Sequence, residues 1–240
     1  MGPLRSILLA TDYRLASQGA AEATVRLATT FGSRVTALHV REEFLSWPVS
    51  PFENQDRLSG QLVAQKVELS EFLFHAGPPA DTVVGKAQEL EVDLLVIGAG
   101  EQVRDGQLVV GPVAESILER ADSPVLAIHP HGPRLAFQSV LCPVDHSRVS
   151  RRALEDAIQL AHALGGRLVV LSVIPDVSWL TAAAETGQLS DAKFEHEAQW
   201  VKEFDEFLAT VSFGGPPCGT PTRSGLAACC SRPRYSWASR

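Results

Sequence analysis

Residues 7–40 read ILLATDYRLASQGAAEATVRLATTFGSRVTALHV, and residues 140–173 read VLCPVDHSRVSRRALEDAIQLAHALGGRLVVLSV. The two segments align without a gap over 34 positions at a constant offset of 133, and eleven aligned pairs are identical. The identical pairs include Asp12 with Asp145 and Ser17 with Ser150. An offset of this size is far longer than the period of a solenoid repeat, so the sequence predicts a duplicated domain.

Each copy has the pattern of a strand, a loop, a helix and a second strand. Short apolar runs at residues 7–10 and 140–144 are typical of buried parallel strands, and an aspartate follows each run closely. Apolar residues at helical spacing come next, until Gly32 and Gly165 end the helices in the C-cap position. Second strands follow at once, at residues 35–40 and 168–174. Because parallel strands require such crossovers, each copy begins with a right-handed βαβ unit.

The rest of the first copy completes a domain. The hydrophobic pattern predicts further helices at residues 56–66, 80–90 and 113–121, and further strands at residues 67–74, 93–98 and 124–128. A polar loop is expected between the last of these helices and the strand before it. The sum is a three-layer α/β domain, in which five parallel strands form an open sheet between helices.

Changes in composition predict the domain boundaries. Residues 1–130 form the complete domain, residues 131–136 a linker, and residues 137–213 a partial second domain that contains a long amphipathic helix at residues 190–211. The segment 214–240 holds four arginines, three cysteines and no acidic residue, and it shows no periodicity. We therefore expect this tail to be disordered, and translation from a shifted reading frame would explain its composition.

Composition and charge exclude several classes of protein. Hydrophobic residues make up 45% of the 240 residues, which is enough for a sizeable core. The net charge of −7 argues against a surface that binds nucleic acid. The apolar run at residues 4–10 is too short for a signal peptide or a membrane span, and the four cysteines lack zinc-type spacing. We expect a cytoplasmic protein without a metal site and without membrane contact.

The repeated strand–Asp–Ser–helix opening, together with VGPVAESILERADSPVLAI at residues 110–128, resembles the universal stress protein family. The resemblance covers one complete domain and the first half of a second. It implies an adenine-nucleotide α-hydrolase-like sheet with strand order 3-2-1-4-5. It also implies a cytoplasmic stress-response protein that assembles as a dimer or as a tandem pseudo-dimer. Some members of the family bind ATP and others do not.

In the ATP-binding members, the fourth strand runs into a loop of the form Gly-x2-Gly-x9-Gly-Ser/Thr, whose amide and hydroxyl groups donate to phosphate. Gly98 and Gly111 match the first and third glycines, but Glu101 and Pro112 stand at the second glycine and at the hydroxyl position. Proline has no amide donor. A carboxylate about 4 Å from a phosphate costs about 4 kcal/mol at an effective dielectric constant near 20. Conventional ATP binding is therefore disfavoured.

The resemblance implies six candidate nucleotide-binding residues at the carboxyl ends of the strands and in this loop. They are Ala10, Asp12, Val40, Gly98, Gly111 and Val113. Structural roles explain most of them equally well. The aspartate that ends the first strand is a common loop and helix cap, the two glycines suit tight turns, and Val40 suits a core. Pro112 suits the first turn of a helix.

The leading hypothesis is a non-enzymatic stress-response protein that acts by assembly or by binding a protein partner, with residues 125–128 as the edge strand of a homo-oligomer. The alternative is an adenine-nucleotide-binding switch that uses the crevice of Asp12 and the Gly98–Gly111 loop, with ATP or another adenine nucleotide as its ligand. An enzyme is disfavoured. The SGG-type pyrophosphate loop and the HxGH motif of enzymes on related scaffolds are both missing after the predicted first strands, and no catalytic set is predicted.

Overall fold

The computed structural model describes residues 4–41, 51–64, 67–100, 102–104, 107–129, 138–173, 189–212, 227–228 and 235–239. The chain forms two compact units that divide between Ala136 and Phe137. We call the described residues up to 129 the first unit and those from 138 onward the second unit. The predicted linker lies outside the described residues.

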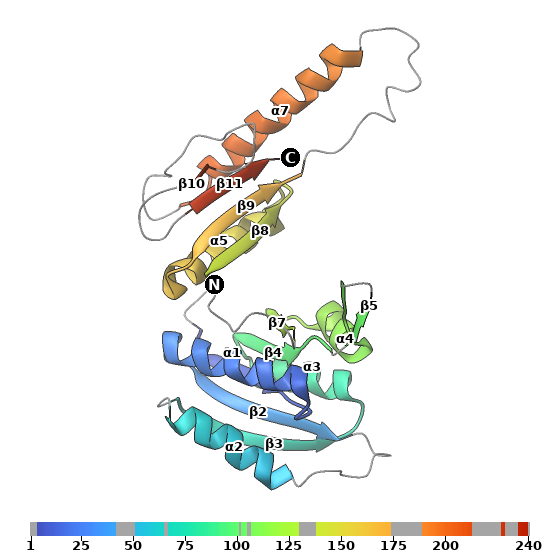
Figure 1. Ribbon diagram of the computed structural model, residues 1–240, viewed down its shortest axis with the longest axis vertical. Coiled ribbons are helices and arrows are strands. Elements are labelled where there is room, and N and C mark those ends of the chain that lie inside the picture. The colour runs from blue at the N-terminus through green and yellow to red at the C-terminus, as the bar shows by residue number, and fades with distance from the viewer. Residues whose placement is uncertain are drawn as a thin grey trace. The chain divides into compact units, whose positions relative to one another are not determined.

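The first unit is built on an open sheet of five strands (Figure 1). The strands are β1 (Ser6–Ala10), β2 (Arg34–Arg41), β3 (Leu69–Ala76), β4 (Leu94–Gly98) and β7 (Val125–Ile128). Their order is β3-β2-β1-β4-β7, and every neighbouring pair is parallel. The predicted order 3-2-1-4-5 is therefore confirmed.

Helices lie on the two faces of this sheet, as a parallel sheet requires. They are α1 (Leu15–Phe31), α2 (Pro51–Ala64), α3 (Pro79–Glu89) and α4 (Pro112–Arg120). Leu8 of β1 and Leu38 of β2 are fully buried in one cluster with residues of α3 and α4. On the other side, Ala16 of α1 lies against Gly98 at the end of β4. Gly32 ends α1 with φ of 68°, which is the left-handed C-cap that the sequence predicts.

One element of the first unit differs from the prediction. The predicted polar loop after β4 contains an antiparallel hairpin of β5 (Gln102–Arg104) and β6 (Gln107–Val109). Each strand has three residues, which is too short for a hydrophobic period to be recognised. The hairpin brings the chain back from the end of β4 to the start of α4.

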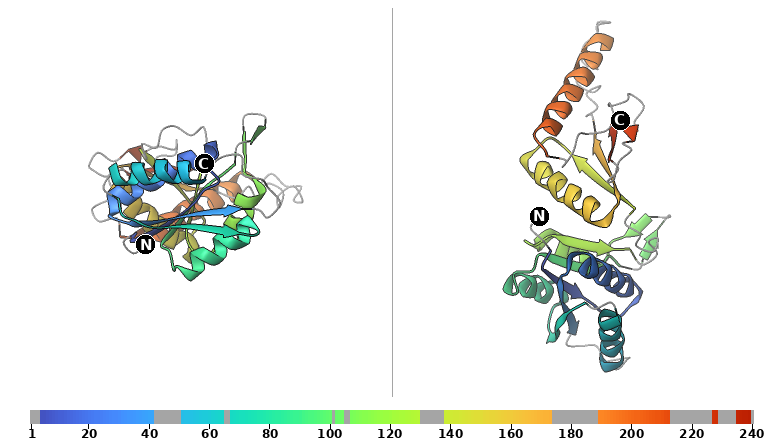
Figure 2. Two further views of the ribbon diagram at one scale, coloured as in Figure 1. Left: turned by 90° about the horizontal axis from the view of Figure 1, so that it is seen from below. Right: turned by 90° about the vertical axis from the view of Figure 1, so that its left-hand side faces the viewer.

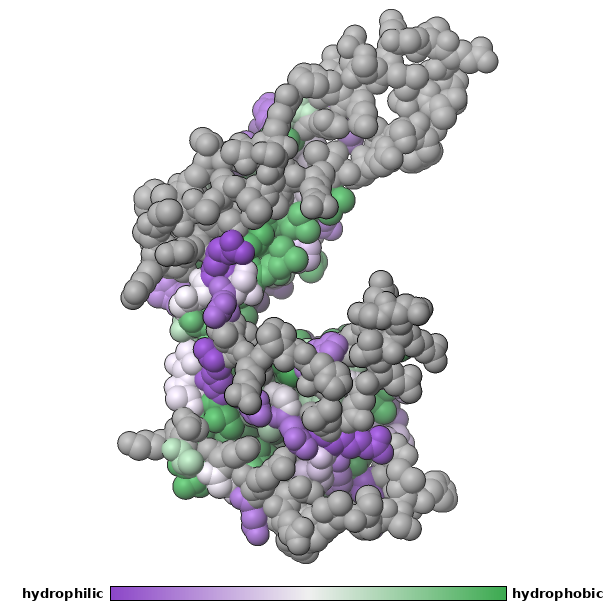
Figure 3. Space-filling model, viewed as in Figure 1, coloured by the Kyte–Doolittle hydropathy of each residue, from purple (hydrophilic) through white to green (hydrophobic). Residues whose placement is uncertain are grey.

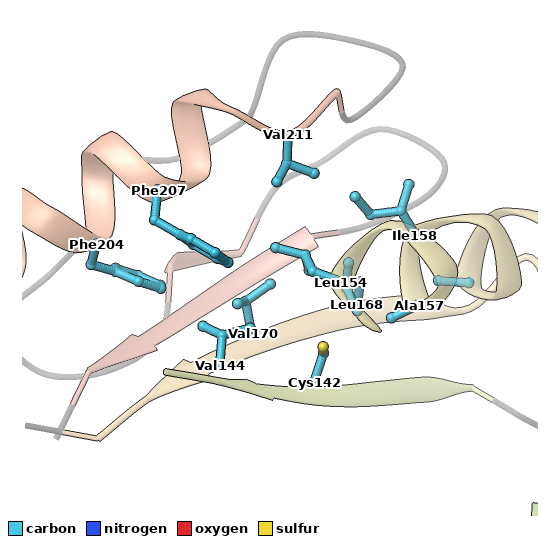
Figure 4. Close-up of a cluster of buried hydrophobic side chains, with 11 residues drawn as sticks. Cys142, Val144, Leu154, Ala157, Ile158, Leu168, Val170, Phe204, Phe207 and Val211 are labelled. Atoms are coloured by element: carbon cyan, nitrogen blue, oxygen red, sulfur yellow. The ribbon is translucent and has the colours of Figure 1, made fainter. Parts of the chain in front are cut away.

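The second unit repeats the opening of the first. It contains β8 (Ser139–Val144), α5 (Arg148–Leu164), β9 (Arg167–Ser172) and the long helix α7 (Leu189–Ala209). β8 pairs in parallel with β9 in the register of β1 with β2, because Ser139 lies opposite Arg167 as Ser6 lies opposite Arg34. Figure 4 shows the core, in which side chains of α5 and α7 pack on one face of the strands. The second copy is therefore a partial domain, as predicted.

The tail differs from the prediction of disorder at the residues that the structure describes. β10 (Ala227–Ala228) and β11 (Tyr235–Ser239) form an antiparallel pair, and β11 also pairs in parallel with β9. β11 thus takes the place beside β9 that β3 takes beside β2. The sequence did not reveal this strand because the open edge of a sheet pairs through backbone groups. Such pairing requires little of the side chains of a five-residue segment, so no hydrophobic pattern marks it. The other residues of 214–240 lie outside the described residues.

We predict that Leu95→Ala destabilises the first unit by about 2–5 kcal/mol, because Leu95 is fully buried on the interior strand β4 and its truncation leaves a cavity. Leu118→Ala is the matched control. Leu118 is 45% exposed on α4, so its truncation changes the stability by less than about 1 kcal/mol. Urea unfolding followed by circular dichroism measures both, and equal losses would contradict the core described above.

Candidate functional site

The candidate site lies where the strand order reverses. The chain runs from β1 outward to β2 and β3, then returns to the other side of β1 as β4. In open α/β sheets, ligands bind beyond the carboxyl ends of the strands at such a point. β1 ends at Ala10 and β4 ends at Gly98, and Val40 is the penultimate residue of β2. The topology therefore brings these three predicted residues to one edge of the sheet.

Asp12 organises the loop that leaves β1. Its Oδ1 accepts hydrogen bonds from the backbone N–H of Arg14 at 3.0 Å and from the hydroxyl of Ser17. The Ser17 hydroxyl oxygen in turn accepts from the backbone N–H of Asp12 at 3.1 Å. These contacts match the capping interpretation of Asp12. The side chain is still 56% exposed, so it lies open to solvent at the edge of the sheet.

The second unit builds the same loop. The backbone N–H of Ser147 donates to Asp145 Oδ1 at 3.0 Å, and the backbone N–H of Asp145 donates to the Ser150 hydroxyl at 3.4 Å. Hydrogen bonds from the side chain and backbone of Ser147, and then from the side chain of Ser150, lower the pKa of Asp145 to about 2. In both units, the duplicated Asp–Ser pair therefore stabilises the loop that follows the first strand.

An aromatic ring follows each of these aspartates in a strained conformation. Tyr13 and His146 occupy equivalent positions in the repeat and have φ angles of 64° and 63°, which is rare for residues other than glycine. The Tyr13 ring stacks on His39 of β2 at 4.7 Å between centroids. Burial raises the pKa of Tyr13 to about 12, so its hydroxyl stays protonated at neutral pH.

The ring of His146 fills the equivalent place in the second unit. It lies 4.6 Å from Trp200 of α7 between centroids, and its Nε2 is 3.1 Å from the hydroxyl of Ser172. Trp200 Nε1 also donates to that hydroxyl, at 3.1 Å. Sequence reasoning missed both rings as parts of the site. The available signal was their common position directly after the repeated aspartate.

Glycines close the loop between β4 and α4. A Cβ on Gly98 would lie 2.8 Å from the Cβ of Ala16, so α1 packs directly on the end of β4. Gly100 has φ of 109°, and a Cβ there would lie 2.9 Å from the backbone nitrogen of Gly111. The phosphate-loop motif has its second glycine at position 101. In this chain it is Gly100 whose backbone lies close to the backbone of Gly111. Glu101 lies outside the described residues.

Two positions at the start of α4 have no amide available for a ligand. The backbone N–H of Gly111 donates to the carbonyl oxygen of Ala99 at 2.9 Å, and Pro112 at the first helical position has no N–H. Gly111 has room for a Cβ, which would meet the Cα of Gly100 at 3.7 Å. Val113 is 39% exposed in the first turn of the helix. The two positions that would carry the phosphate contacts therefore present no free amide.

Two segments of the sequence match one family description. The model of the universal stress protein family (Usp) matches residues 3–129 and residues 136–219, which together make up most of the chain. The chain belongs to the universal stress protein family. The two matched segments correspond to the two copies of the repeat, so this universal stress protein is of the tandem type. A search of curated proteins found no match.

Solved structures show the same fold. A protein of unknown function from Pseudomonas aeruginosa PAO1 has a TM-score of 0.61 and 19% identity, over 89% of this chain and 71% of that chain. A putative universal stress protein from P. aeruginosa UCBPP-PA14 has a TM-score of 0.60 and 17% identity, over the same shares. A universal stress protein from Archaeoglobus fulgidus DSM 4304 has a TM-score of 0.56 and 18% identity, over 84% of this chain and 76% of that chain.

The described part of this universal stress protein shows neither a metal centre nor a membrane-spanning helix. Those residues contain no cluster of three His, Cys, Asp or Glu side chains that could hold a metal ion. Cys142 is a buried free thiol whose pKa is raised by burial. None of the described helices is long and apolar enough to cross a membrane.

We predict that Gly100→Ala destabilises the first unit by about 1–3 kcal/mol, because the variant combines an unfavourable φ angle with a contact against the backbone of Gly111. Gly111→Ala is the matched control and changes the stability by less than about 1 kcal/mol. Urea unfolding of both variants measures the difference. If Gly111→Ala were the more damaging change, this description of the loop would be wrong.

A second prediction concerns the protonation of Asp145. Its folded-state pKa of about 2 lies below the ordinary value of 3.8, so its contribution to stability is present above about pH 4 and is lost as the pH falls toward 2. Carboxyl-carbon NMR titration is expected to give a pKa near 2 in the wild type and a value nearer 3.8 in Ser147→Ala. A wild-type titration near 3.8 would exclude the Ser147 hydrogen bonds.

Proposed function

We propose that this chain is a non-enzymatic stress-response protein that acts by assembly or by binding a protein partner, and that its nucleotide site is degenerate. The observation that supports the proposal is the state of the would-be phosphate contacts. The Gly111 amide is bonded to Ala99, Pro112 has no amide, and the Asp12 carboxylate caps its own loop. The buried free thiol of Cys142 is compatible with a reducing cytoplasm, where we place the protein.

The proposed assembly surface in the first unit is the edge strand β7. Of the described strands, only β4 pairs with it. The carbonyl of Ile128 accepts a hydrogen bond from the N–H of Ala99, so the backbone groups of Ile128 point toward β4 and those of Ala127 point toward the free edge. A second copy can therefore pair with β7 through the backbone of Val125 and Ala127.

Light scattering coupled to size-exclusion chromatography tests this assembly. We expect a wild-type mass of about twice 25.8 kDa. Ala127→Pro removes one N–H at the free edge while keeping the bonds to β4, so it is expected to shift the mass toward the monomer. Ala127→Ser keeps that N–H and is expected to remain dimeric. A wild-type protein that is monomeric at working concentration would refute assembly through β7.

The second candidate function is an adenine-nucleotide-binding switch at the same edge of the sheet. Ala10 and Val40, at the carboxyl ends of their strands, are half-buried and favour this function. The space beside Gly111, which would admit a Cβ, and the exposed carboxylate of Asp12 also favour it. Calorimetry with ATP, ADP, AMP and cyclic nucleotides separates the two functions. The degenerate site predicts no saturable heat at millimolar ligand. Saturable binding that Asp12→Ala abolishes would establish the switch instead.

A further inference from the structure

Among the described residues, the sheet of the second unit is covered on one face only. Every second residue along β8 and β9 points into the core that these strands form with α5 and α7. The residues between them point to the opposite face of the sheet. We call this opposite face the bare face and define it by Leu141, Pro143, Val169, Leu171 and Val173. Leu141 is 60% exposed and Val173 is 62% exposed. Apolar side chains gather over β8 in Figure 3.

The equivalent residues of the first unit lie in a core. At the offset of 133, Leu141 corresponds to Leu8, and Leu171 corresponds to Leu38. Both Leu8 and Leu38 are 0% exposed, because α3 and α4 cover that face of the sheet. The two leucines are retained in the second copy, and so is the valine at positions 40 and 173. The bare face is thus the inner surface of a domain whose cover is missing from the described second unit.

The edge of β8 is open in the same way. β1 pairs with both β2 and β4, whereas β8 pairs only with β9 among the described strands. The carbonyl of Gln138 accepts from the N–H of Arg167 in β9, so the backbone groups of Ser139 and Leu141 point to the opposite edge. That edge corresponds to the one that β4 occupies beside β1.

The size of the bare face argues against a second copy as its cover. β8 and β9 have six residues each. At about 4.8 Å between strands and about 3.3 Å per residue, these two strands present a face of about 200 Å². A stable complex buries about 800 Å² on each partner, so two bare faces packed together fall short. A partner that also pairs with the edge of β8 buries considerably more. The first unit shows such a cover in α3, β4 and α4.

We propose that the bare face and the open edge of β8 bind a strand–helix partner. This partner is a polypeptide that adds one parallel strand to β8 and packs apolar helix faces on Leu141, Leu171 and Val173. Its chemistry is that of residues 79–128 of this chain, which perform both tasks in the first unit. The surface is separate from the β7 edge, so it gives the chain a second binding function in addition to the assembly proposed above.

Fluorescence anisotropy of a labelled synthetic fragment, residues 79–129 of this chain, titrated with the full-length protein, tests the proposal. We expect saturable binding with a Kd in the micromolar range. Leu141→Asp in the full-length protein is expected to weaken binding at least about tenfold, because it places a charge in the apolar contact. Val149→Asp is the matched control and leaves binding unchanged, since Val149 is 78% exposed on α5 and outside the bare face.

Further variants separate the alternatives. A fragment with Leu95→Asp is not expected to bind, because Leu95 lies opposite Leu8 in the β1–β4 pair. Ala127→Pro in the full-length protein should leave fragment binding intact, so failure of the β7 assembly is recognised independently. The proposal is overturned if the fragment does not bind at about 100 μM, or binds wild type and Leu141→Asp equally. It is also overturned if Leu141→Asp only converts a dimer to a monomer, because a second copy would then cover the face.

Discussion

A parallel sheet must be covered on both faces, and this constraint governs both halves of the chain. Parallel strands are joined by crossover helices that lie on the faces of the sheet. Both faces of such strands are therefore apolar, and both need packing partners. The first unit meets the requirement with helices on both faces of its five strands (Figure 2). The second unit carries the same apolar strands but, in its described residues, meets the requirement on one face only.

The polar groups at the candidate site are also bonded within the protein. In this chain, the carboxylate of Asp12, the amide of Gly111 and the close approach of Gly100 serve to fold the loops themselves. The duplicate loop around Asp145 uses its serines in the same way, without any glycine loop beside it in the described residues. A polar group that is hydrogen-bonded within the protein must give up that bond before it can bind a ligand. This exchange lowers the binding free energy that the group can contribute.

The sequence predicted the elements whose signal is long or repeated. The 34-residue duplication gave the βαβ units, and the left-handed C-caps at Gly32 and Gly165 lie where the pattern placed them. The short hairpin of β5 and β6 and the tail strand β11 were missed, because three to five residues carry too little periodicity. The left-handed turns at Tyr13 and His146 were missed because tyrosine rarely adopts a positive φ, and histidine, although enriched there, adopts it in only a small fraction of cases. The role of Gly100 depends on a contact with Gly111, eleven residues away, which no local pattern encodes.

The difference between a covered and a bare sheet is measured most directly by amide hydrogen exchange at two equivalent leucines. The N–H of Leu8 points toward β4, whereas the N–H of Leu141 points to the open edge of β8. The account predicts slow exchange at Leu8 and fast exchange at Leu141 in the isolated protein, as resolved by NMR. Equal protection of the two amides would contradict it, because the edge of β8 would then already be paired.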